Sequence, residues 1–298
     1  MHSDHCRRAS GQGVSYLEFE ELSYASPDDP VLKRWLIHAV EHLSGRPKLL
    51  PLYKVWRDLA AKKPDHMMRE LLKIIELDVA IGGRPWPPAV KPSTPLVMIA
   101  NHPTGIGDGI IMLAMAEEIG RPYRVFVDRR LLKIPEVRPY ALPIDHANTR
   151  QAVRMNLRSR QLAREFLSQN HTVIIFPAGA VATARWPFGR ARELPWKNFA
   201  ARLIQGAEAS VLPVYFDGQN SPLFHLVSRL SMTLRISLLV SEFMRRFRRS
   251  RVRVTVGDVV PFSELEAKHN GRLLTAELAG LVKVLEPLGT KTESTKPC

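Results

Sequence analysis

An apolar run that predicts a buried strand, Leu96 to Ala100, ends in the polar pair Asn101 and His102, and a glycine-containing turn then leads to Asp108. A histidine after a strand, followed by a carboxylate that opens a helix, is suited to acid–base chemistry. The spacing allows Asp108 to fold back onto the imidazole and fix its tautomer. A structural histidine and a helix cap fit the same residues. The pair predicts His102 as a candidate base with Asp108 as its partner.

A second polar turn follows another predicted strand and contains Phe176, Pro177 and Gly179. Ligands bind at the carboxyl ends of strands in open α/β sheets. Amides around Gly179 could hold an anion or a developing oxyanion. A tight turn that requires glycine for its backbone alone fits equally well.

Basic residues follow both regions. Arg129, Arg130 and Lys133 come after a predicted strand, and Arg185 comes after the second turn. Arginine suits planar anions such as phosphate. Solvation of a charged surface is the alternative for each of them.

Other chemistries lack their motifs. The run Gly105 to Gly109 does not fit the dinucleotide fingerprint, which requires glycine where Ile110 stands. Walker, Cys-x-x-Cys, His-Glu-x-x-His and Gly-x-Ser-x-Gly motifs are absent from the sequence. The terminal His2, His5 and Cys6 favour a frayed end over a metal site. We therefore predict no metal site and no serine nucleophile.

The charge points to anionic partners. The chain has 298 residues, a formal charge of +14 and a pI near 10.1, which favours a phospholipid surface, nucleic acid or an acidic carrier protein. Residues 245–253 contain six arginines, each worth about 1 kcal/mol near an anionic lipid surface. Nucleic acid is not expected, because only Phe247 is aromatic there.

The chain has no run of 18 or more uncharged apolar residues, so a spanning helix is not predicted. Its N-terminus has no basic-then-apolar signal pattern. We expect a cytoplasmic protein, peripheral on the inner face of the cell membrane.

The elements that position these residues are predicted from periodicity. Residues 1–25 are polar and expected to be loose, and residues 26–84 predict a helical subdomain whose third helix runs from Pro64 to Ile81. A linker with five prolines spans 85–95. Strands and helices then alternate over 95–290, which predicts an α/β domain with a mixed sheet flanked by helices.

The blocks around His102 and Gly179, with 128–145 between them and 211–216 after them, resemble in order and spacing the signature blocks of the glycerolipid acyltransferases. These are the 1-acylglycerol-3-phosphate acyltransferases, and the haemolysin-like, ornithine-lipid branch is most similar. The resemblance covers about residues 95 to 260. Two departures are visible: five residues rather than four separate His102 from Asp108, and Ala178 and Val181 replace the usual Glu and Arg.

The resemblance implies the glycerol-3-phosphate acyltransferase-like fold and acyl transfer to a lysolipid hydroxyl. The donor would be acyl-CoA or acyl-acyl carrier protein, with no other cofactor. It implies His102 as the base, Asp108 as its partner, and substrate contacts at Asn101, Thr104, Gly105, Arg129, Arg130, Lys133, Phe176, Pro177, Gly179 and Arg185. Two alternatives remain open: a non-catalytic basic module that binds membrane or nucleic acid, and a thioesterase that uses the same pair with water.

Overall fold

The computed structural model describes residues 46–228, 232–265 and 270–287, and in addition the isolated positions 22, 23, 30, 31, 34, 35, 37, 38 and 42. Apart from those positions, the predicted loose N-terminus and the first predicted helix lie outside the described residues. So do His2, His5 and Cys6.

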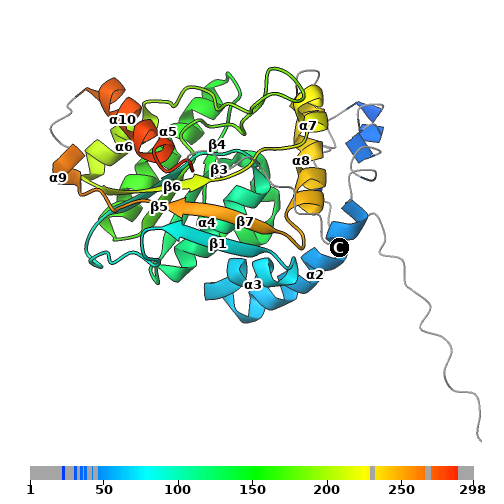
Figure 1. The fold of residues 1–298 in the computed structure, drawn as a ribbon, viewed down its shortest axis with the longest axis horizontal. Helices are drawn as coiled ribbons and strands as arrows, with labels where there is room; N and C mark the ends of the chain where they lie inside the picture. The colour runs from blue at the N-terminus through cyan, green and yellow to red at the C-terminus, as the bar shows by residue number, and fades with distance from the viewer. Residues whose placement is uncertain are drawn as a thin grey trace, which may run out of the picture.

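A mixed sheet forms the centre of the molecule (Figure 1). Within the described residues its seven strands are β1 (Asp78–Gly83), β2 (Leu96–Ala100), β3 (Tyr123–Asp128), β4 (Ala141–Ile144), β5 (Thr172–Ile175), β6 (Ser210–Phe216) and β7 (Arg251–Val256). Their order is β1-β7-β6-β2-β5-β3-β4. Neighbouring strands run parallel except β6 and β7, which pair antiparallel. The predicted mixed α/β fold is confirmed.

Helices cover both faces of this sheet (Figure 1). The α-helices are α2 (Arg46–Lys62), α3 (Met67–Ile74), α4 (Ile106–Glu118), α5 (Arg150–Ser168), α6 (Phe199–Ala207), α7 (Pro222–Val227), α8 (Met232–Arg246), α9 (Phe262–Leu265) and α10 (Gly271–Lys283). Short 3₁₀ helices span Pro64–His66, Arg129–Lys133 and Pro135–Tyr140. In Figure 1, α7 and α8 stand at the opposite end of the molecule from α9 and α10.

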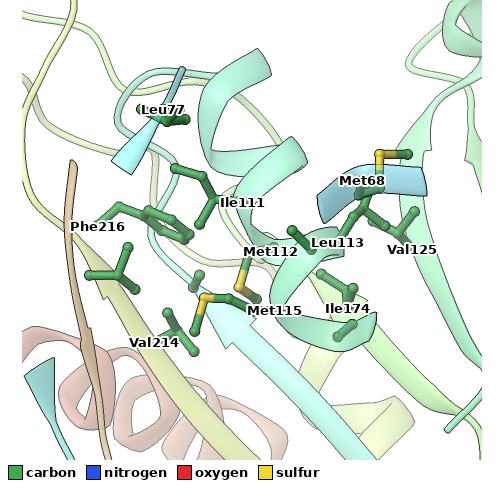
Figure 2. Packing of buried hydrophobic residues seen from close by; sticks show 14 of the residues in the cluster. Met68, Leu77, Ile111, Met112, Leu113, Met115, Val125, Ile174, Val214 and Phe216 are labelled. Carbon is green, nitrogen blue, oxygen red and sulfur yellow. The ribbon is translucent and has the colours of Figure 1, made fainter. Parts of the chain in front are cut away.

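The core consists of two apolar layers, one on each side of the sheet. Every residue of β2 is buried, as expected for a central strand covered on both faces. Met112 and Met115 of α4 pack against Val214 of β6 on one side (Figure 2). The other side is filled by residues of α5, α6 and α10.

One predicted element is wrong. The helix predicted from Pro64 to Ile81 ends at Ile74, and residues 78–83 form β1, which pairs with β7. Glu76 has a left-handed backbone with φ of 54°, which a helix cannot continue through. Val79 and Ile81 alternate with a period of two, which also fits a strand. The last part of the predicted helical subdomain therefore belongs to the central sheet.

Candidate active site

The polar residues predicted from sequence meet where parallel strands end. Since β2, β5 and β6 run parallel, the residues after their carboxyl ends lie at one edge of the sheet. Ligands bind at this edge in open α/β folds. The first two strands deliver His102 and Phe176, whose rings stack with centroids 4.1 Å apart.

The predicted histidine–carboxylate contact is present. His102 Nδ1 lies 3.1 Å from Asp108 Oδ2. The Asp108 side chain is 1% exposed and that of His102 is 18% exposed. Because Nδ1 faces the carboxylate, Nε2 is the nitrogen left for a substrate.

The turn before α4 holds the Asp108 carboxylate in place. The backbone amides of Thr104 and Gly105 donate to Oδ2 at 2.8 and 2.9 Å, and the Thr104 hydroxyl donates to Oδ1. Gly105 has φ of 93°, which only glycine adopts readily. Thr104 and Gly105 were predicted to contact substrate. In the structure their backbone amides and the Thr104 hydroxyl hold the Asp108 carboxylate.

The two glycines between His102 and Asp108 have different roles. Gly105 supplies the left-handed backbone, whereas Gly107 is in α4, and a Cβ there would overlap the ring of Phe247. The buried Phe247 ring thus packs directly against the first turn of the helix that carries Asp108.

Asn101, which was predicted to contact substrate, uses its side-chain amide within the fold. Its Nδ2 donates to the Phe216 carbonyl at 2.9 Å, and its Oδ1 accepts from the Phe216 amide at 2.7 Å. Both polar atoms of the amide are therefore engaged with the end of β6. The side chain fixes the end of β2 just before His102.

Glu193 is a site residue that sequence reasoning missed. Its Oε1 accepts from the His102 backbone amide at 2.6 Å, and its Oε2 accepts from the Trp196 indole at 3.0 Å. Burial raises the pKa of the Glu193 carboxyl above its ordinary value. No local sequence pattern indicates this contact, because Glu193 is 91 residues from His102. Only the fold brings the two residues together.

The turn after β5 has the tight backbone that was one of the two alternatives predicted for it. The Gly179 amide donates to the Phe176 carbonyl at 2.9 Å, so it closes a turn and is already used as a donor. The Pro177 carbonyl likewise accepts from the Lys197 amide at 3.2 Å. The Lys197 side chain lies beside the turn, since a Cβ on Gly179 would be 3.2 Å from Nζ. Lys197 was not predicted.

An arginine approaches Val181 from another element. Arg235 of α8 donates from Nη2 to the Val181 carbonyl at 2.6 Å. Burial lowers the pKa of its guanidinium. Arg235 thus contacts the backbone of Val181 from a helix 54 residues further along the chain.

Of the four basic residues predicted to contact an anion, three contact protein groups and the fourth is exposed. Arg130 forms a bidentate pair with Asp128, and Arg129 Nη1 lies 3.4 Å from Asp145 Oδ2. Lys133 donates to the Ser23 carbonyl. Arg185 is exposed, two residues beyond the Thr183–Arg192 bridge. Arg129 and Arg130 follow β3, which β5 separates from β2.

The arginine-rich segment 245–253 is partly neutralised. Arg249 pairs with Glu76, Arg251 with Asp78 and Arg253 with Asp217. Arg245 and Arg246 remain exposed at the end of α8.

Two structural features concern possible ligands and membranes. Across the described ranges, no three His, Cys, Asp or Glu side chains cluster as a metal site would require. No helix in the same part of the chain is both long enough and apolar enough to cross a bilayer.

Comparison with known proteins identifies a family. A family profile described as "Acyltransferase" matches residues 88–274. The lyso-glycine lipid O-acyltransferase of Phocaeicola vulgatus is 26% identical over 178 residues, which are 56% of this chain and 60% of that protein. The enzyme of the same name from Bacteroides thetaiotaomicron is 29% identical over 178 residues, 56% of this chain and 61% of that protein. The chain thus spans about 60% of the length of the curated relatives it matches.

A solved structure also matches. It is the 1-acyl-sn-glycerophosphate acyltransferase PlsC from Thermotoga maritima, with a TM-score of 0.48 and 16% sequence identity. The match covers 86% of this chain and 91% of that one.

Proposed function

Because the chain belongs to the acyltransferase family, we propose that it moves a fatty acyl group from a thioester to the hydroxyl of a lysolipid. The observation that carries the proposal is the His102–Asp108 pair, at 3.1 Å, at the carboxyl edge of the sheet. A base there, oriented by a buried carboxylate, is what hydroxyl attack on a thioester requires.

In the proposed step, His102 Nε2 takes the proton from the acceptor hydroxyl as its oxygen attacks the thioester carbonyl. The tetrahedral intermediate then collapses, the carbon–sulfur bond breaks, and the thiolate receives the proton from the imidazolium. Asp108 stabilises the imidazolium while it exists. Phe176 packs on one face of the ring, which limits the directions from which the acceptor can approach.

The acceptor that we propose is an amino-acid lysolipid of the lyso-glycine or lyso-ornithine type. Two curated relatives are named lyso-glycine lipid O-acyltransferases. Val181 also cannot provide the charge that a phosphate monoester would need. Arg235 and Lys197 lie beside the turn after β5 and suit a single carboxylate on the acceptor.

The remaining partners are also proposals. Acyl-CoA or acyl-acyl carrier protein is the proposed co-substrate, and no further cofactor is needed for the step. The protein would work peripherally on the inner face of the cell membrane, where the positive charge of the chain attracts anionic lipid.

The test is an acylation assay with lyso-glycine lipid, lyso-ornithine lipid and lysophosphatidic acid as acceptors. His102→Ala should lower turnover by about two to four orders of magnitude, because general-base catalysis is lost. Asp108→Asn should lose most of the rate while keeping the shape of the site, because an amide cannot stabilise an imidazolium. Folding of both variants is checked by circular dichroism.

The products separate the alternatives. Diacylated amino-acid lipid supports the proposal, and free fatty acid from every acceptor would indicate the thioesterase. Near wild-type turnover by His102→Ala would remove the mechanism. Turnover of lysophosphatidic acid alone would overturn the acceptor class, in which case Arg185→Ala is the next variant to assay.

A further inference from the structure

A hairpin next to the site exposes two aromatic side chains. Thr183 and Arg192 form an antiparallel bridge with backbone hydrogen bonds of 3.1 and 3.0 Å. At the tip, the Gly189 amide donates to the Trp186 carbonyl at 2.9 Å, which closes a tight turn around Pro187 and Phe188. We refer to residues 183–192 as the tip hairpin.

The exposure of the tip is unusual for such large apolar groups. Phe188 is 90% exposed and Trp186 is 66% exposed. On α7, Leu223 is 50% exposed and Leu226 is 46% exposed. Burying a large apolar side chain is favourable, so a partner that covers these residues would gain binding free energy.

The tip hairpin and α7 are held together. The Ala184 amide donates to His225 of α7 at 3.2 Å, and Gln219 contacts both Ala191 and Gly189 at 2.8 and 3.2 Å. The Gln219 carbonyl also accepts a hydrogen bond from Arg246. The tip hairpin is therefore joined, through Gln219, to the beginning of the arginine-rich segment.

Both ends of the tip hairpin are also attached to the candidate base. Ala182, just before it, donates to the His102 carbonyl at 2.8 Å. Glu193, just after it, accepts from the His102 amide at 2.6 Å. A partner bound to the tip hairpin would therefore lie at a defined position relative to His102.

We propose that the tip hairpin enters the headgroup region of an anionic phospholipid bilayer, with Trp186 and Phe188 as the inserted side chains. Arg185, Arg190 and Arg192 flank the aromatics and are exposed, and Arg190 also pairs with Glu286. Aromatic side chains beside basic ones are typical of interfacial anchors. This inference rests on the proposed function. An acceptor lipid in that bilayer would be presented next to His102.

A lipid surface fits these observations better than an acidic protein. The aromatic residues occupy a tight turn, so they project as a convex tip. A soft lipid phase accepts such a tip without a matching shape, whereas a protein partner must supply a pocket for it.

The experiment measures sedimentation of the protein with vesicles made of equal parts phosphatidylglycerol and phosphatidylcholine. Wild type is compared with Trp186→Ser/Phe188→Ser. The control is Val153→Ser/Leu157→Ser, which removes two exposed apolar side chains from α5. All three are also measured in the His102→Ala background, so that binding is assessed without acyl transfer.

The tip variant should bind at least about tenfold more weakly, and the control should stay within about twofold of wild type. Part of the wild-type binding should persist at about 0.5 M salt, since insertion of the aromatics is not screened. Equal binding by tip variant and wild type, or equal loss in the control, would overturn the inference. The inference would also be overturned if the tip variant bound vesicles like wild type but bound acyl carrier protein more weakly. Because binding needs no turnover, failure here leaves acyl transfer intact, and failure of acyl transfer leaves this result intact.

Discussion

Glu193 contacts the backbone of the candidate base rather than its ring. Each of its two oxygens accepts one hydrogen bond, from the His102 amide and from the Trp196 indole. Only a carboxylate can accept on both oxygens at once. Glu193 is therefore a positioning residue, and its protonation state affects both the site and the stability of the fold.

Glu193→Gln should lower kcat by roughly tenfold, because one of the two donors then faces an amide NH₂ and His102 is held less firmly. Burial raises the pKa of Glu193, so the folded protein keeps a proton that the unfolded chain releases. The free energy of unfolding of wild type should therefore fall, relative to the variant, as pH rises from about 4.5 through the raised pKa. Denaturant unfolding across pH measures this.

The exposed Glu264 provides the matched control. Glu264→Gln should leave kcat unchanged. A Glu193→Gln enzyme with wild-type kcat would show that the contact to His102 has no influence on the reaction.

Individual residues were predictable where the chemistry is local. His102 and Asp108 are six positions apart, so strand, turn and helix signals suffice to bring them together. Glu193, Lys197 and Arg235 reach the site through contacts between distant elements, which no local pattern encodes. For Asn101 and Gly179 the sequence indicated the right place, but the fold uses their polar groups internally.

At the scale of elements, the first turn of α4 depends on contact with the end of α8. Gly107 lies against the ring of Phe247. Gly109, one residue after Asp108, faces open space where its Cβ would be. The two glycines are in the same helix, so substituting each of them separates packing from backbone effects.

Gly107→Ala should destabilise the protein by about 1–3 kcal/mol through overpacking against Phe247, and should reduce turnover because Asp108 moves with the turn. Gly109→Ala should instead be neutral or stabilise by up to about 1 kcal/mol, since alanine favours the helix. Thermal unfolding and acylation rates measure both. Equal effects of the two substitutions would contradict the packing role.

The alternation of strands and helices after the proline-rich linker was predicted from the sequence and is present in the structure. Their apolar runs are long and bounded by turn residues, as in β2 and β6. β1 was missed because Leu71, Leu72 and Ile75 continue a helical pattern directly into Val79. The strand forms only because β7 offers an edge, and such a partner is invisible in a local pattern.

At the scale of the whole molecule, the N-terminal helices share their core with the sheet. Glu117 of α4 accepts from the Met68 and Arg69 amides of α3 and from the Tyr123 hydroxyl of β3. Trp56 of α2 packs in the same cluster as β-strand residues. We infer that the described part of the chain unfolds as one unit.

Unfolding monitored by tryptophan fluorescence and by far-ultraviolet circular dichroism should therefore coincide, with equal calorimetric and van't Hoff enthalpies. Glu117→Ala should lower the free energy of unfolding by roughly 1–3 kcal/mol or more, because buried donors lose their acceptor, while the transition remains single. Two separated transitions in wild type would instead favour an independent helical subdomain.

The pairing of β1 with β7 also has a consequence for synthesis of the chain. Glu76, next to β1, forms its ion pair with Arg249, 173 residues further along, so β1 leaves the ribosome long before its partner exists. Pairing at such a separation is slow, since the loop must close before any contact forms. Until then the nascent segment must avoid other strands, and Gly82, Gly83, Arg84 and Pro85 at its end are residues that discourage unwanted edge pairing. The sheet is thus completed at this edge only after β7 has been made.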